Sequence, residues 1–163
     1  MQLQTALAVF VLVFTAASSV AAAETVRTGY IPLPPGSGNV HEAEPPSRIL
    51  FLNRCKDGCT LSPSGSDDSR TNRSTIVPST TTIAPYPYGD ASWKRVVVCV
   101  KAIYRDFDME ITDQDPGTTP HYEAIVAGRP TDVGMNPNVG GVAPFACGVI
   151  DNAITFTFAQ MLG

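Results

Sequence analysis

The sequence predicts an α/β fold in which one long helix packs on a β-sheet. Apolar residues between Trp93 and Phe107 recur at intervals of three and four, as they do on one face of a helix. Two later segments alternate apolar and polar residues, which is typical of strands with one buried face, and a third segment between them carries apolar residues on both sides. A helix followed by several strands indicates a layered α/β fold rather than a helical bundle. Nearly all of this periodicity lies between Asp90 and Phe158, so the core is expected there.

The helix is expected to begin just after Asp90, whose carboxylate can accept hydrogen bonds from the first turn as an N-cap. Its basic residues Lys94, Lys101 and Arg105 fall on the face opposite the apolar one. A strand is the alternative, because β-branched residues such as Val96–Val98 suit strands. The pattern persists for about four turns, longer than a typical strand, and therefore favours the helix. The apolar face consists of Trp93, Val96, Val97, Val100, Ile103, Tyr104 and Phe107.

The strands are expected at residues 48–53, 109–113, 122–127 and 153–159. The second stops at the turn signal Asp115-Pro116-Gly117. In the third, Glu123, Ile125 and Ala127 share one side. The polar residues from Cys55 to about Tyr88 are rich in Ser, Thr and Pro, and they predict a long surface excursion without core elements.

The beginning of the chain predicts export. Residues 6–17 are apolar apart from Thr15, and Val20-Ala21-Ala22-Ala23 has the small residues of a signal-peptide cleavage site, placed after Ala23. A membrane anchor is the alternative, but the run is short for a span and has no basic flank. The sequence thus divides into a signal peptide (1–23), a Pro/Gly-rich spacer (24–46) and one domain (47–163), with a secreted, extracellular location.

The formal net charge of −4 includes no basic cluster of the kind that nucleic acids or anionic membranes require. No nucleic-acid partner is therefore expected, and no membrane partner after signal cleavage.

Four cysteines in an exported chain predict disulfides. Three pairings of the four are possible. The first choice is a local bridge between Cys55 and Cys59, which flank a short turn, and Cys99 on the helix could then pair with Cys147. A nucleophilic cysteine would need a nearby base, and the chain contains only His41 and His121.

Acidic residues offer the only other candidates for chemistry. Asp113, Asp115 and Glu123 could act in general acid–base catalysis, or bind a hard cation together with Asp67 and Asp68. None of these residues has the spacing of a known calcium loop, and two distant histidines cannot form a zinc-peptidase site. No catalytic, cofactor-binding or metal-binding residue is therefore assigned. Asn72-Arg73-Ser74 matches the pattern for N-glycosylation.

The chain contains an ordered series of short motifs: residues 49–55, 58–60, 67–72, Trp93 with Val98-Cys99-Val100, Phe107-Asp108, 111–117, 121–128, 141–144 and 151–156. This series resembles the front half of secreted bacterial zinc metalloprotease-like proteins of the metzincin type. The resemblance covers about residues 48 to 160.

The resemblance implies a partial metzincin-like upper subdomain, with a strand, a long helix and then mostly parallel strands in a twisted sheet. In that family the zinc-binding helix follows the strand that would end near Phe158. Zinc is therefore expected only in a complete family domain, and no zinc ligand is carried over to this chain.

Two hypotheses follow. The chain is the scaffold half of a secreted zinc metallopeptidase-like protein, inactive alone, or it is a non-catalytic extracellular module that binds a peptide or protein or has a structural role. Whether it is an enzyme, and its oligomeric state, are left open by the sequence.

Overall fold

The computed structural model describes residues 46–161. The predicted signal peptide, its cleavage site after Ala23 and the spacer up to residue 45 lie outside the described residues. The described part contains one α-helix, eight strands and three short 3-10 helices. In chain order they are β1 (Ile49–Asn53), β2 (Cys59–Pro63), η1 (Ser69–Thr71), β3 (Arg73–Ser74), β4 (Thr81–Ile83), α1 (Gly89–Tyr104), β5 (Glu110–Thr112), β6 (Tyr122–Val126), η2 (Pro130–Val133), β7 (Gly141–Val142), β8 (Ile154–Thr157) and η3 (Ala159–Met161).

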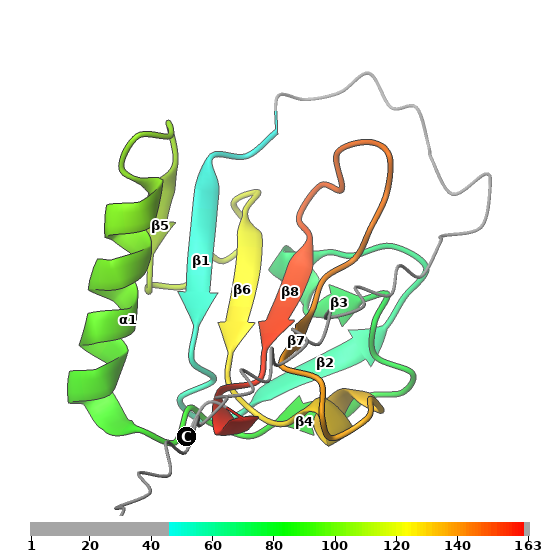
Figure 1. Ribbon diagram of the computed structural model, residues 1–163. Helices are drawn as coiled ribbons and strands as arrows, with labels where there is room; N and C mark the ends of the chain where they lie inside the picture. The colour runs from blue at the N-terminus through cyan, green and yellow to red at the C-terminus, as the bar shows by residue number, and fades with distance from the viewer. Residues whose placement is uncertain (1–45, 162–163) are drawn as a thin grey trace, which may run out of the picture.

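The main sheet has five strands in the order β5-β1-β6-β8-β7. The first four are parallel to one another, and only the edge strand β7 runs antiparallel to its neighbour. Phe51 of β1, Glu123 of β6 and Ile154 of β8 lie at one register position across its three middle strands. The mostly parallel α/β sheet expected from the sequence is thus confirmed, with all four predicted strand segments in it (Figure 1).

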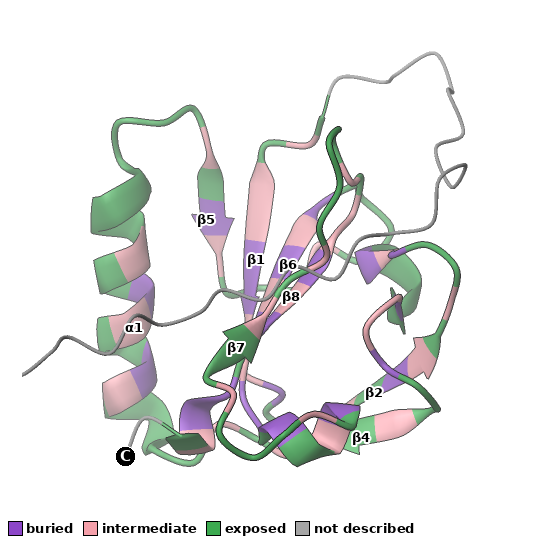
Figure 2. Cartoon of the chain, turned by 45° about the vertical axis from the view of Figure 1, so that its right-hand side comes forward, coloured by how far each residue is buried: buried purple, intermediate pink, exposed green. Residues whose placement is uncertain are grey.

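Helix α1 covers one face of this sheet. Its buried residues Trp93 and Val97 pack against Leu52 of β1 and Ile111 of β5. In Figure 2 the buried positions of α1 lie on the side toward the sheet and exposed positions on the outer side.

Two details of the predicted helix were wrong. The helix ends at Tyr104, and the N–H of Phe107 donates to the Tyr104 carbonyl in the turn toward β5, which leaves Phe107 and also Ile103 largely exposed. Asp90 lies in the first turn but is not the N-cap, which is Tyr88. The Asp90 carboxylate instead accepts a hydrogen bond from the Arg54 guanidinium, because a cation is a stronger donor than a peptide N–H.

The polar passage between Cys55 and Tyr88 does contain core elements, contrary to the prediction. It forms a three-stranded sheet in the order β3-β2-β4, and it buries Leu61 and Ile83 completely. These strands have two to five residues, with few apolar side chains among Ser, Thr and Pro. Such short strands do not give a recognisable alternation, which explains why the sequence pattern missed them.

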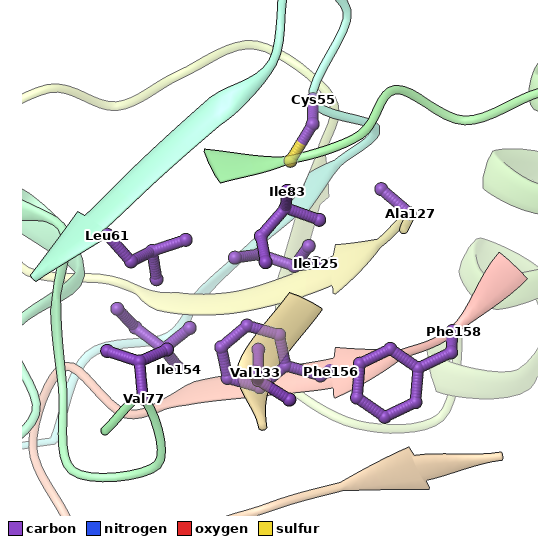
Figure 3. Close-up of a cluster of buried hydrophobic side chains, with 10 residues drawn as sticks. All are labelled: Cys55, Leu61, Val77, Ile83, Ile125, Ala127, Val133, Ile154, Phe156 and Phe158. Atoms are coloured by element: carbon purple, nitrogen blue, oxygen red, sulfur yellow. The ribbon is translucent and has the colours of Figure 1, made fainter. Parts of the chain in front are cut away.

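The main apolar core lies between the two sheets (Figure 3). Both sheets and the loops between them contribute residues to this core. Its buried members are Cys55, Leu61, Val77, Ile83, Ile125, Ala127, Val133, Ile154, Phe156 and Phe158. The alternation of Ile154, Phe156 and Phe158 against Thr155 and Thr157, expected from the sequence, is confirmed.

The edge strand β7 begins at Gly141, the second residue of the doublet Gly140-Gly141. A Cβ atom on Gly141 would lie 2.7 Å from the backbone oxygen of Phe156, so the close pairing of β7 with β8 requires glycine here. Within residues 46–161, no helix is both long and apolar enough to span a membrane.

Candidate functional site

The strongest candidate for a site is a group of buried polar residues where β1, β6 and β8 meet the passage before η1. We call it the Glu123 cluster, and it consists of Asn53, Asp67, Ser69, His121 and Glu123. Asp67, Ser69, His121 and Glu123 are buried, and Asn53 is partly buried. Buried ionisable groups are expensive unless they are paired, so each one needs a physical explanation.

Glu123 lies on the core side of β6, in phase with Ile125 and Ala127. Its Oε1 accepts a hydrogen bond of 2.7 Å from the Asn53 side-chain amide. Its Oε2 is buried and has no hydrogen-bond partner among the described residues. Burial raises the pKa of Glu123 from 4.5 to about 7; the hydrogen bond from Asn53 opposes this rise and the charge of Asp115 adds to it.

The rest of the cluster holds the backbone in place. Asp67 accepts hydrogen bonds from the N–H groups of Thr75 (2.6 Å) and Ile154 (2.9 Å), so it ties the passage between β2 and η1 to the start of β8. Ser69 donates to the His121 carbonyl. These are satisfied structural bonds, and they account for the burial of both polar residues.

His121 is fixed at the start of β6. Its Nδ1 donates to the Thr119 carbonyl at 2.7 Å, and its ring packs edge-on against Phe51. Its backbone N–H donates to the Asn152 side chain. The sequence left His121 as a remote candidate for pairing with a cysteine, but both unbridged cysteines are exposed whereas His121 is 1% exposed.

The position of the Glu123 cluster in the sheet is informative. Glu123 and Ile154 are at the amino ends of β6 and β8, whereas open parallel sheets bind ligands beyond the carboxyl ends of their strands. A carboxyl with a pKa near 7 suits proton transfer, but a substrate would have to reach an oxygen that is buried. The cluster can therefore take up a proton at neutral pH, and in this conformation it cannot reach an external molecule.

The carboxyl ends of the strands carry charged residues that are already paired. Beyond β1, Arg54 binds Asp90 and lies 5.9 Å from the centre of the Trp93 ring. The Arg54 guanidinium lowers the pKa of Asp90 below its usual value. Beyond β6, Arg129 hydrogen-bonds to Gln160. These contacts join loops to α1 and η3.

The other acidic candidates are dispersed. Asp113 accepts a 3.1 Å hydrogen bond from the Trp93 indole N–H, and Asp115 accepts from the Gly117 N–H in the turn before β6. Asp68 binds Arg70, which lowers the pKa of the Asp68 carboxyl below its usual value. Among the residues that the structure describes, no group of three or more His, Cys, Asp or Glu could hold a metal ion.

The cysteines form one bridge of the two that the sequence predicted. Cys55 and Cys59 are joined across the turn, with their Cα atoms 5.0 Å apart. Cys99 and Cys147 are free and exposed, so that predicted pairing was wrong. Cys99 is on α1, which packs on the β5–β1 side of the sheet, whereas Cys147 lies in the loop between β7 and β8 at the opposite edge (Figure 1).

The glycosylation pattern Asn72-Arg73-Ser74 lies at the end of η1. Asn72 is exposed with a left-handed backbone (φ 55°), while Ser74 is fully buried and its hydroxyl accepts from the Ile76 N–H.

Comparisons with family models, with curated proteins and with solved structures find no match. The resemblance to metzincin-type proteins therefore stays a prediction from the sequence motifs.

Sequence reasoning considered Glu123, His121 and Asp67 as candidates for chemistry, but not Asn53 or Ser69. Asn53 as the partner of Glu123 was missed, because the pairing of β1 with β6 is not visible in either strand alone. One signal was present: Glu123 is in phase with Ile125 and Ala127, and a glutamate on the apolar side of a strand indicates a buried carboxyl.

Proposed function

We propose that residues 47–163 are the scaffold part of a secreted, zinc metallopeptidase-like domain of the metzincin type. In this proposal the chain positions a sheet and a helix but supplies no metal ligand. A metal centre would come from sequence that is not among these 163 residues.

One observation carries this proposal. The motif series from Ile49 to Phe156 implies a strand, a long helix and then mostly parallel strands, and the chain has β1, α1, β5, β6 and β8 in that order with all four strands parallel. The resemblance places a zinc-binding helix after the strand near Phe158, and β8 ends at Thr157. The agreement between the implied and the observed order of elements supports the proposed fold. The proposed zinc-peptidase chemistry depends on the sequence motifs alone.

The zinc content of the purified protein tests the proposal. After equilibration with zinc and dialysis, we expect no stoichiometric zinc by elemental analysis and no cleavage of peptide substrates, because two separated histidines cannot form a tetrahedral site. Tight zinc binding together with peptide cleavage that a chelator abolishes would show that this chain carries the chemistry itself. Reading the coding DNA beyond the codon for Gly163 is an independent test, because we expect it to encode His-Glu-x-x-His.

A second candidate function is a non-catalytic extracellular module that binds a peptide or protein. It is favoured by the covering of both faces of the main sheet, by α1 on one side and by the second sheet on the other. This function predicts a single cooperative unfolding transition for the protein on its own. A molten product with secondary structure but no fixed near-UV signal would contradict it.

A further inference from the structure

The outer side of α1 carries a continuous group of exposed apolar side chains. Val98 is 66% and Ile103 is 63% exposed, and Cys99 and Ala102 are exposed between them. Residues three and four apart are neighbours on a helix, so these four side chains adjoin one another. We call this group the α1 outer face. Single exposed apolar residues are ordinary, but adjoining ones indicate an interaction surface.

Basic side chains border this apolar group. Lys94, Arg95, Lys101 and Arg105 are all exposed, and the sequence from Ala91 to Arg105 contains no acidic residue. The chain as a whole has a net charge of −4, so this helix is a local reversal of sign.

The acidic residues follow immediately along the chain. Residues 106–115 contain no Lys or Arg and run through β5, which lies at the end of the main sheet with β1 as its one neighbour. The acidic residues of this segment, from the turn before β5 to the turn after it, are all exposed. We call them the acidic β5 edge: Asp106, Asp108, Glu110, Asp113 and Asp115.

We propose that this side of the molecule binds a second copy of the chain, related by a two-fold axis, with the α1 outer face of each copy against the acidic β5 edge of the other. In a two-fold contact the same patch is used by both copies, so it has to be complementary to itself. A patch that carries a basic half and an acidic half meets this requirement twice, and the apolar residues of the α1 outer face would exclude water from the basic half of the contact.

The presence of both basic and acidic residues on this surface also favours a second copy of the chain over other partners. An anionic lipid surface or a nucleic acid would be attracted by Lys94 and Lys101 but repelled by the carboxylates beside them. Two internal ion pairs involve these charges, Arg48–Asp108 and Arg105–Asp106. All four side chains are more than two-thirds exposed, and such pairs are weak, so the charges remain available to a partner.

Sedimentation equilibrium tests the proposal, with Cys99→Ala and Cys147→Ser in every variant, so that disulfides cannot cause association and position 99 stays apolar. We expect a monomer–dimer equilibrium at low ionic strength that weakens as salt is added, because exposed charges are screened. Val98→Asp is expected to lower the association constant at least tenfold. The matched control is Val149→Asp, since Val149 is 67% exposed in the β7–β8 loop at the opposite edge of the sheet, and it should leave association unchanged.

A charge exchange adds a specific test. Lys101→Glu and Glu110→Lys should each weaken self-association, because each places like charges across both halves of the contact. A mixture of these two variants should form heterodimers, in which both halves are again opposite in sign. A protein that is monomeric under all conditions would overturn the proposal, as would equal effects of Val98→Asp and Val149→Asp. Binding to phosphatidylserine vesicles without self-association would also overturn it.

Discussion

At the scale of single residues, Glu123 has the most unusual environment in the described chain. Its carboxyl lies on the core side of the central strand β6, with one oxygen bonded to Asn53 and the other without a partner. No basic side chain bonds to it, and the charge that acts on its pKa is the carboxylate of Asp115, which raises it. The folded protein therefore holds this carboxyl protonated over a pH range in which an unfolded chain ionises it.

This difference makes stability depend on pH in a defined direction. Between pH 4.5 and about 7, Glu123 ionises in the unfolded state but stays protonated in the folded state. The unfolded state then binds fewer protons, so the free energy of unfolding falls as the pH rises, by about 3 kcal/mol in total, and levels off above pH 7. Below pH 4.5 the carboxyl is protonated in both states and contributes no pH dependence.

Glu123→Gln tests this account, because the amide has the same shape and does not ionise. We expect the free energy of unfolding of the variant to lack this part of the pH dependence. Relative to that of the wild type, it should therefore rise by about 3 kcal/mol between pH 4.5 and pH 8. Urea unfolding at a series of pH values measures this difference. The control is Glu110→Gln, at an exposed position of β5. Parallel plots of the free energy of unfolding against pH for the wild type and Glu123→Gln would refute the account.

At the scale of elements, α1 depends on a few side chains on one face. Trp93 and Val97 are buried against Leu52 and Ile111, and the Trp93 indole N–H donates to Asp113 after β5. The helix begins without a side-chain cap, so packing on the sheet contributes most of its stability.

Val97→Ala should therefore destabilise the protein by roughly 2 kcal/mol, because it removes two buried methyl groups and leaves a space that the sheet cannot fill. Trp93 is the sole tryptophan, so its fluorescence reports whether α1 remains packed on the sheet. Val98→Ala, one residue further along the helix and exposed, should cost less than about 0.5 kcal/mol. Equal losses for the two variants would show that the helix does not pack in this way.

At the scale of the whole molecule, the sequence predicted one layer well and missed the other. The parallel strands and α1 were found because each carries several apolar residues in period. The second sheet went unrecognised, since Leu61 and Ile83 are isolated apolar residues among Ser, Thr and Pro, and their burial depends on contacts between distant segments. The supports of Glu123 were missed for the same reason: Asn53 is 70 residues away in sequence.

Gly128 shows where the two sheets are joined. It follows β6 with φ 62°, and a Cβ atom there would lie 2.5 Å from Cγ2 of Ile83 on β4 and 2.7 Å from Oδ2 of Asp132. Asp132 cannot move away without cost, because this oxygen accepts the Arg129 N–H. The second sheet therefore approaches the first as closely as it does only because this position has no side chain.

Gly128→Ala should in consequence cost roughly 2–5 kcal/mol, from the left-handed backbone and from the displacement of Ile83. Gly65→Ala is the matched control, since its Cβ would meet nothing within 4 Å, and it should change the free energy of unfolding by less than about 0.5 kcal/mol. Urea unfolding measures both, and hydrogen exchange locates the effect. We expect faster exchange in β2 and β4 than in β1 for Gly128→Ala, because the added methyl group pushes the second sheet away from the first. A small, evenly distributed loss of stability would show that the two sheets are not held together at this glycine.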